Sequence, residues 1–331
     1  MAARLPEQSR DLPVVVALGS VDPALVSGVL DGHCRFVAAP GDAELAAAQG
    51  AIARADAQVD QVLLRRAPAL RVIARTGVGT DLIDVPAATA RGIAVVITPG
   101  AGAAAVAEGA IGMALHLVKR FGPLTALVRQ GRWAERAGVS VGDLDGATLG
   151  VVGYGRIGRR TAALAAAFGM RILAYDPVGE PPADLRCDGL GDLAARSDVI
   201  TLHLPLDEQT RHLVDDAFLA RVRKSAVLVN CSRGGLIDTD AVWRALTDGR
   251  LSGVGLDVFD PEPPGRHPLY RHPDVVLTPH LMGLSRRATA ATFTAAARGV
   301  LDVLSGREPR AVADPGWRTP CTKETTHDHR Y

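Results

Sequence analysis

Short apolar runs alternate with alanine-rich stretches along most of this chain. Runs rich in valine, isoleucine and leucine lie at residues 14–18, 72–75, 94–97, 149–152, 171–175, 199–202, 226–229, 253–258 and 275–277. Because each run is apolar on both faces, we expect buried strands that are covered by helices on either side. Strands and helices that take turns along a chain form parallel sheets. The pattern therefore predicts an α/β fold with doubly wound parallel sheets.

The length of 331 residues suits two domains, because a single hydrophobic core stops growing efficiently near this size. The longest helical stretch, residues 103–119, is followed by a break at Gly122 and Pro123 and is expected to connect the domains. Residues 131–145 are glycine-rich and irregular, so a second sheet is expected before residue 100. A further helix is predicted at 285–304. The polar segment 313–331 is predicted to be a disordered tail.

The charge balance and the cysteines limit the kinds of partner. Lys and Arg number 37 against 36 Asp and Glu, so no strong field attracts nucleic acid or an anionic membrane, and a small-molecule partner is expected. Cys34, Cys187, Cys231 and Cys321 lie far apart, which predicts no metal site and fits reduced thiols in the cytoplasm. No apolar run approaches the roughly 18 residues that span a bilayer, so neither membrane insertion nor secretion is expected.

A glycine-rich turn follows the apolar run at 149–152 and precedes a helix at 159–168. The turn reads Gly153, Tyr154, Gly155, Arg156, Ile157, Gly158. In such a turn the first glycine allows the sharp bend, the second lets a pyrophosphate approach the backbone, and the third lets the helix pack on the strand. The phosphates then bind at the helix N-terminus. A purely structural turn is the alternative, but the order strand, turn, helix favours a dinucleotide site.

Asp176 ends the next strand, 18 positions after Gly158. An acidic side chain at this place accepts hydrogen bonds from the adenosine ribose and repels a 2′-phosphate. The following Pro177, Val178 and Gly179 supply no arginine to receive that phosphate. Asp176 could also be an ordinary residue of a turn at the strand end. The segment favours NAD over NADP as the cofactor.

Three further segments place a reactive side chain after a strand, where open α/β sheets bind their ligands. Arg233 follows the strand at 226–229, and its planar guanidinium suits a substrate carboxylate. Glu262 lies between two prolines, and His280 follows the strand at 275–277. A carboxylate such as Glu262 would fix the tautomer of a histidine that exchanges protons during hydride transfer. Singly, each has an ordinary explanation as an ion pair, a turn charge or a strand end. Their order after the cofactor turn favours one shared site.

These residues, in this order, resemble the D-isomer-specific 2-hydroxyacid dehydrogenases over nearly the whole chain. Further matching segments lie at residues 75–81, 98–100, 107–108, 201–206, 210–212, 230–238, 255–263 and 278–280. The resemblance implies a Rossmann NAD-binding domain at 101–283, inserted into a flavodoxin-like substrate domain formed by 1–100 and 284–312. It also implies a homodimer with the helix near 103–120 at the interface, and a short form without the regulatory domain that some relatives carry.

The same resemblance implies roles for single residues. Arg233 would bind the carboxylate of a 2-oxo acid, His280 would protonate the developing alkoxide, and Glu262 would orient and charge His280. Asp257 would lie near the nicotinamide carboxamide. Further cofactor contacts are expected from six residues: His203, Leu204, Pro205, Thr210, Cys231 and Gly283. The backbone of Val78 and Gly79, together with Arg75, would complete the substrate site.

Arg54 lies where phosphoglycerate dehydrogenases of this family place a substrate-facing arginine, which would suit a second anionic group on the substrate. It could equally be an ordinary solvated arginine. Ile97 and Leu82 stand where many members have asparagine, which weakens assignment to one subfamily. Two other functions stay open. The same scaffold can oxidise formate or phosphite, and co-repressors built on it bind partners in an NAD-linked manner without needing turnover.

Overall fold

The computed structural model describes residues 12–54 and 56–318. The chain divides into two compact units: unit 1 comprises Met1–Gly102 and Arg286–Tyr331, and unit 2 comprises Ala103–Ser285. The chain thus leaves unit 1 and later returns to it. Each crossing lies two residues further along the chain than the predicted domain boundary.

Unit 1 is built on a parallel sheet of five strands in the order β2-β1-β3-β4-β5. The strands are β1 (Val14–Leu18), β2 (Arg35–Val37), β3 (Ala48–Ala53), β4 (Val72–Arg75) and β5 (Ala94–Val96). This is the strand order of flavodoxin-like folds. The sequence pattern did not predict β2 and β3. β3 reads AQGAIA and contains one β-branched residue, so its strand character comes from pairing between β1 and β4.

Helices cover both faces of the unit 1 sheet. They are α1 (Ser27–Leu30), α2 (Asp42–Ala47), α3 (Gln61–Arg66), α4 (Val85–Ala90) and α11 (Arg286–Leu304), with short 3-10 helices η2 (Pro23–Leu25) and η6 (Pro315–Arg318). Successive residues of β1 alternate between the faces: Val15 joins the core under α11, and Val16 joins the core under α2, α3 and α4. Both faces are therefore buried, as doubly wound sheets require.

The C-terminal segment is ordered further than the sequence predicted. The N–H group of Ala313 donates to the carbonyl oxygen of Val95 at 2.8 Å, and the Asp314 carboxylate accepts a hydrogen bond from Thr89 Oγ1 at 2.8 Å. Trp317 packs against the core under α11. The prediction of disorder from residue 313 is therefore wrong for 313–318, because these residues find partners on β5 and α4. The rest of the predicted tail, 319–331, lies outside the described residues.

Unit 2 is built on a second parallel sheet, in the order β11-β10-β9-β8-β6-β7. The strands are β6 (Thr148–Val152), β7 (Arg171–Tyr175), β8 (Val199–Leu202), β9 (Ala226–Asn230), β10 (Leu251–Leu256) and β11 (Val275–Leu277). A parallel bridge between Ala174 and Arg186 extends the sheet beyond β7. With this bridge as a further strand the order is that of the Rossmann fold. The strand order reverses between β6 and β8, where such sheets bind ligands.

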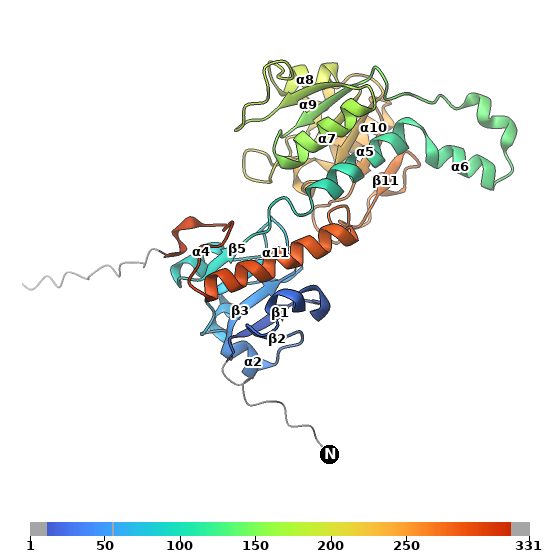
Figure 1. Ribbon diagram of the computed structural model, residues 1–331. Helices are drawn as coiled ribbons and strands as arrows, with labels where there is room; N and C mark the ends of the chain where they lie inside the picture. Colours follow the sequence, from blue (N-terminus) through green and yellow to red (C-terminus); the bar gives the residue numbers. More distant parts are fainter. Residues whose placement is uncertain (1–11, 55, 319–331) are drawn as a thin grey trace, which may run out of the picture. The chain divides into compact units, whose positions relative to one another are not determined.

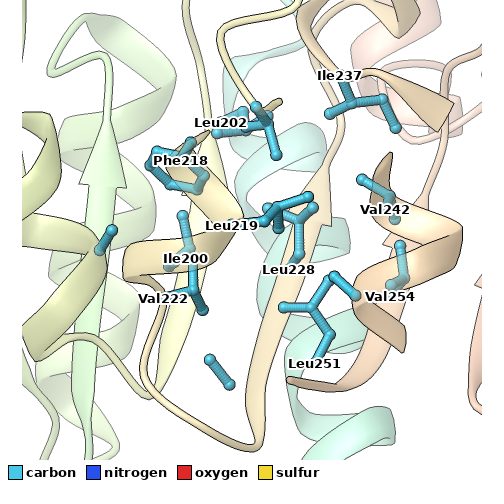
Figure 2. Close-up of a cluster of buried hydrophobic side chains, with 14 of the residues drawn as sticks. Ile200, Leu202, Phe218, Leu219, Val222, Leu228, Ile237, Val242, Leu251 and Val254 are labelled. Atoms are coloured by element: carbon cyan, nitrogen blue, oxygen red, sulfur yellow. The ribbon is translucent and has the colours of Figure 1, made fainter. Parts of the chain in front are cut away.

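Two helical layers cover the unit 2 sheet. α5 (Ala103–Val118) and α7 (Arg156–Ala167) pack on one face. α8 (Leu190–Arg196), α9 (Asp216–Arg221) and α10 (Thr239–Thr247) pack on the other, over the core shown in Figure 2. The short 3-10 helices η4 (Gly234–Leu236) and η5 (Pro268–Arg271) lie in the connections. Within β8, Val199 faces the first layer, and Ile200 and Leu202 face the second.

An extended arm follows α5. It contains α6 (Phe121–Arg129) and the 3-10 helix η3 (Trp133–Gly138), and it projects from the rest of unit 2 before the chain enters β6 (Figure 1). Among the described residues, no single helix has the length and apolar character to cross a membrane. Only α5 and α6 taken together pass that test, and they are bent by 58° relative to each other.

Candidate active site

The glycine turn joins β6 to α7 at the carboxyl edge of the unit 2 sheet. Gly153 has a φ of +95°, and a Cβ there would lie 2.7 Å from the carbonyl carbon of His203. A Cβ at Gly158 would lie 2.0 Å from the carbonyl oxygen of Gly153, so this glycine lets α7 pack closely. Gly155 is exposed, and a Cβ there would meet nothing within 4 Å. The space beside the first N–H groups of α7 therefore suits a phosphate.

Asp176 follows β7, and its carboxylate accepts hydrogen bonds from three backbone N–H groups. Oδ2 accepts from Tyr154 at 2.7 Å, and Oδ1 accepts from Val178 at 3.0 Å and Gly179 at 2.8 Å. Burial opposes ionisation, but these donors and the nearby Arg159 charge outweigh it and lower the pKa of Asp176 below its ordinary value. Asp176 is therefore an anion at neutral pH, directly beside the glycine turn. The other turn residues, Arg156 and Ile157, open α7.

The segment after β8 begins with a neutral histidine. His203 Nε2 lies 3.1 Å from Thr201 Oγ1, and Nδ1 is buried with no hydrogen-bond partner among the described residues. Burial lowers the pKa of His203 to about 4. The adjoining Leu204 is buried, and the carbonyl oxygen of Pro205 accepts a hydrogen bond from the Thr210 hydroxyl at 2.8 Å. The segment therefore forms a closed loop beside the glycine turn.

Arg233 leaves the sheet three residues after β9. Its Nη1 donates to the carbonyl oxygen of Ser232 at 2.8 Å. The buried Asn230 donates from Nδ2 to the carbonyl oxygen of Arg233 at 2.8 Å, and its Oδ1 accepts from Ser232 N–H at 3.1 Å. A Cβ at Gly234 would lie 1.9 Å from the carbonyl carbon of Phe259. The loop of Arg233 is therefore fixed by Asn230 and packs directly against the segment that leads to Glu262.

Glu262 and His280 form a hydrogen-bonded pair. Glu262 Oε2 lies 2.8 Å from His280 Nδ1, and Oε1 accepts from the N–H group of Phe259 at 3.0 Å. The backbone of His280 has a φ of +54°, and its N–H donates to the carbonyl oxygen of Thr278 at 3.0 Å. The Glu262 side chain is 38% exposed, and the His280 side chain is 46% exposed. The pair is therefore held in place by its own loops and is still open to a substrate.

The buried carboxylate of Asp257 accepts hydrogen bonds from residues before and after His280 in the chain. Oδ1 accepts from Thr278 Oγ1 at 2.6 Å and from Leu281 N–H at 2.9 Å, and Oδ2 accepts from Met282 N–H at 3.1 Å. These donors lie on both sides of His280 in the chain. Asp257 therefore fixes the loop that carries the histidine. The sequence had indicated Asp257 only as a cofactor contact.

Two further predicted cofactor residues, Cys231 and Gly283, lie against α5. Cys231 is buried, and its Sγ lies 3.9 Å from Met113 Sδ. Burial, with a smaller effect from the charge of Asp257, raises the pKa of the Cys231 thiol to about 12. Cys231 is therefore an uncharged thiol at neutral pH. Gly283 lies against α5, where a Cβ would be 3.5 Å from Val106.

One row of contacts along the sheet edge brings the predicted unit 2 residues together. The loop of His203 touches the glycine turn, and the hydroxyl of Ser232 donates to the carbonyl oxygen of Leu204. The Arg233 loop then meets the segment of Glu262, which binds His280. Sequence reasoning missed Asn230 and Thr278 as positioning residues. The available signal was a polar residue at the end of an otherwise apolar strand.

The predicted substrate-binding residues of unit 1 are Arg54, Arg75, Val78 and Gly79, and they lie at or beyond the ends of two neighbouring strands. Arg75 ends β4, and Arg54 directly follows the neighbouring β3. Arg75 Nε donates to the carbonyl oxygen of Gly79 at 2.8 Å, and Nη1 donates to that of Thr76 at 3.2 Å. Within the described residues, the N–H groups of Val78 and Gly79 donate no hydrogen bond. The loop is therefore shaped by Arg75 and keeps two donors for an anion.

Comparisons with known proteins point to one family. Residues 111–282 match the model described as "D-isomer specific 2-hydroxyacid dehydrogenase, NAD binding domain". The chain is 40% identical over 260 residues to D-3-phosphoglycerate dehydrogenase from Methanocaldococcus jannaschii, an alignment that covers 77% of this chain and 49% of that protein. It is 36% identical over 266 residues to glyoxylate reductase from Thermofilum pendens, with 78% of each chain covered.

Solved structures are similar as well. D-lactate dehydrogenase from Aquifex aeolicus, determined with NAD and lactic acid, has a TM-score of 0.76 at 28% identity, with 88% of this chain and 96% of that chain covered. The chain spans about half the length of the phosphoglycerate dehydrogenase that it matches. The family model and the relatives agree with the Rossmann sheet and the glycine turn. This chain belongs to the D-isomer specific 2-hydroxyacid dehydrogenase family.

Proposed function

We propose that this protein is an NAD-dependent oxidoreductase that reduces a 2-oxo acid to a D-2-hydroxy acid or catalyses the reverse reaction. The observation that carries the proposal is the hydrogen bond of 2.8 Å between Glu262 Oε2 and His280 Nδ1. The pair lies on the same sheet edge as a complete dinucleotide turn. Family membership and the names of the relatives, which include glyoxylate reductase and hydroxypyruvate reductase, support the same reaction class.

The cofactor site fits NAD by its shape and its charge. Gly155 leaves open space at the N-terminus of α7, where N–H groups and the helix dipole favour a pyrophosphate. The anionic Asp176 can accept hydrogen bonds from the ribose hydroxyl groups, and its negative charge would repel a 2′-phosphate. His203 and Cys231, which would contact the cofactor, are both uncharged at neutral pH. When bound, NADH supplies the hydride that the 2-oxo acid accepts.

His280 exchanges the proton of the reaction. Because Nδ1 faces Glu262, Nε2 is the nitrogen that faces away from this carboxylate and holds the proton for the C2 oxygen. In reduction, His280 gives this proton to the developing alkoxide, and in oxidation it takes the hydroxyl proton. The Glu262 carboxylate holds the orientation of the ring through Nδ1. Asp257 keeps the histidine loop in place through its bonds to Thr278 and Leu281.

Arg233 binds the substrate carboxylate. Its guanidinium presents parallel N–H donors that match the two carboxylate oxygens. Asn230 fixes the backbone from which Arg233 extends, so the donors are positioned before the substrate arrives. In unit 1, the open N–H groups of Val78 and Gly79 and the cation of Arg54 favour an acidic substrate, and Arg54 suits one with a second anionic group.

Turnover tests the proposal directly. NADH oxidation is followed at 340 nm with glyoxylate, hydroxypyruvate, pyruvate and 3-phosphohydroxypyruvate. We expect at least one substrate to be reduced, and His280→Ala and Arg233→Ala to lower kcat/KM by about 100-fold or more. Arg54→Gln is expected to raise KM only for the phosphorylated acid. His33→Ala, on an exposed turn of unit 1, is the matched control. Unchanged rates in the His280 and Arg233 variants would exclude this mechanism.

The projecting arm supports a homodimer. Four of its apolar side chains are exposed in the single chain, Val128 and Trp133 at 62% each: Phe121, Val128, Trp133 and Val141. Apolar side chains gathered on a projecting segment are typical of a protein interface. We propose that two copies of the chain associate through this arm, next to the predicted interface helix α5.

A further inference from the structure

A cavity lies at the edge of the unit 2 sheet that is opposite to the glycine turn. It is partly open to solvent, has a volume of about 380 Å³ and is lined by Thr148, Arg171, Leu173, Ala195, Arg196 and Arg223. Thr148 and Arg171 are the first residues of β6 and β7, whereas the glycine turn follows the last residue of β6. The five residues of β6 separate the two edges by about 15 Å at roughly 3.3 Å per residue. The cavity is therefore distinct from the cofactor site.

Three arginines converge on this cavity, and two of them have acidic partners. Arg196 pairs with Asp192 at 2.7 Å, and Arg223 pairs with Asp198 at 2.8 Å. Arg171 Nε donates to Thr148 Oγ1 at 3.3 Å. Among the residues that the structure describes, Arg171 forms no ion pair. The three lining arginines and their two acidic partners therefore leave one uncompensated positive charge at the cavity.

The negative end of α8 opposes this charge only in part. The carbonyl oxygen of Leu193 accepts a hydrogen bond from Ser197 Oγ, and that of Ala194 accepts from the N–H group of Arg223. The carbonyl groups of the last turn of α8 are thus partly satisfied inside the protein. An anion in the cavity meets guanidinium donors. A volume of 380 Å³ also lies within the range of small-ligand sites.

We propose that the cavity formed by Arg171, Arg196 and Arg223 binds a small anion that carries at least two negative charges, such as a phosphate monoester or pyrophosphate. Guanidinium groups bind phosphate oxygens through parallel N–H donors, and a multiply charged anion can contact several arginines at once. The half-exposed ion pairs with Asp192 and Asp198 are weak enough to rearrange around such a ligand. This site stands independently of the redox reaction proposed for the other edge.

Calorimetric titration with pyrophosphate at constant ionic strength, with and without excess NAD, tests this site. We expect saturable binding under both conditions, weakened about tenfold in each of Arg171→Gln and Arg223→Gln, because one charge-assisted hydrogen bond is lost. Asp192→Asn removes a competing negative charge and is expected to tighten binding severalfold. Arg244→Gln breaks an exposed ion pair with Asp216 outside the cavity and is the matched control.

Circular dichroism and thermal unfolding establish that each variant is folded before titration. The proposal is overturned if pyrophosphate shows no saturable binding, or if Arg244→Gln weakens binding as much as the cavity variants do. It is equally overturned if excess NAD abolishes binding while Arg171→Gln and Arg223→Gln leave it unchanged, because the probe then occupies the glycine turn. Acetate serves as the monovalent comparison and is expected to bind far more weakly.

Discussion

Asp176 is a single side chain that sets both the shape and the charge of the adenosine end of the cofactor site. Its carboxylate holds Tyr154 of the glycine turn and stays ionised because N–H donors and Arg159 lower its pKa. Asp176→Asn removes the charge and keeps a hydrogen-bond acceptor. We expect the ratio of kcat/KM for NADPH to that for NADH to rise about tenfold, which is roughly 1.4 kcal/mol of lost repulsion. Steady-state kinetics with both cofactors measures this ratio.

Asp188→Asn is the matched control for that measurement, since this exposed carboxylate lies on the connection that follows β7. Its cofactor ratio is expected to stay at the wild-type value. An Asp176→Asn variant that kept the wild-type preference would show that discrimination against the 2′-phosphate comes from other groups.

His203 makes the free energy of unfolding depend on pH. Its folded pKa is about 4, below the ordinary value of 6.5, because burial disfavours the charged ring. As pH falls from 6.5 towards 4, the unfolded chain binds a proton there that the folded chain does not. The free energy of unfolding should then fall by up to about 3 kcal/mol, all of which is present above pH 6.5.

Urea unfolding of the apo protein at pH 6.5, 5.5 and 4.5 measures this loss. In His203→Gln the decline over the same window should be smaller, because the titrating group is gone. The control His33→Gln, at an exposed position, should decline as the wild type does. Identical pH slopes in His203→Gln and the wild type would contradict the assignment of the proton to this buried ring.

Within the glycine turn, two glycines serve different purposes, and alanine separates them. Gly158→Ala places a Cβ 2.0 Å from a backbone oxygen, so the turn must shift, and we expect a loss of about 1–3 kcal/mol in the free energy of unfolding. Gly155→Ala meets open space and should cost less than about 1 kcal/mol. The added methyl group, however, occupies the space that the pyrophosphate needs.

Both variants are therefore expected to bind NADH at least tenfold more weakly, but only Gly158→Ala should be clearly destabilised. NADH fluorescence titration and urea unfolding give the two readouts. Gly28→Ala, at a glycine of the short helix α1 with free space around it, is the control for both. Wild-type NADH affinity in Gly155→Ala would mean that the phosphates do not lie over this residue.

The elements that could be predicted from the sequence are those whose local pattern agrees with their burial. β8 and β9 are buried throughout, consist mostly of apolar residues and lie in the middle of the unit 2 sheet. β2 and β3 were not predicted. β2 has three residues, and β3 is mostly alanine and glycine because its neighbours leave little room: a Cβ at Gly50 would lie 2.8 Å from Val300. Such strands are specified by tertiary contacts, which a local pattern does not contain.

The candidate site shows the same division. Arg233, Glu262 and His280 could be found because each carries its chemistry in its side chain and follows a strand. The role of Asp257 in holding the His280 loop could not be found in this way, because its hydrogen bonds with Thr278, Leu281 and Met282 depend on how β10 and β11 pair. The sequence therefore predicts which groups react, and the folded sheet determines what holds them.

At the scale of the whole molecule, the arm of α6 and η3 leaves apolar side chains exposed in the single chain. The Trp133 side chain is 62% exposed, and a partner that covers it would remove apolar surface from water, which favours association. We expect the wild-type protein to elute as a dimer. Trp133→Glu places a charge in the proposed interface, where its desolvation disfavours association, and should shift the protein towards monomer. Light scattering during size-exclusion chromatography gives the mass directly.

Val178→Glu is the control, since this side chain is 94% exposed on the loop after β7 and away from the arm. It should leave the dimer intact. Because Trp133 contributes nothing to the cores of unit 2, thermal unfolding of a dilute Trp133→Glu sample should show a cooperative transition, which separates lost association from lost folding. A wild-type protein that stays monomeric at all concentrations would exclude the proposed dimer. A Trp133→Glu variant that stays dimeric would place the dimer interface outside the arm.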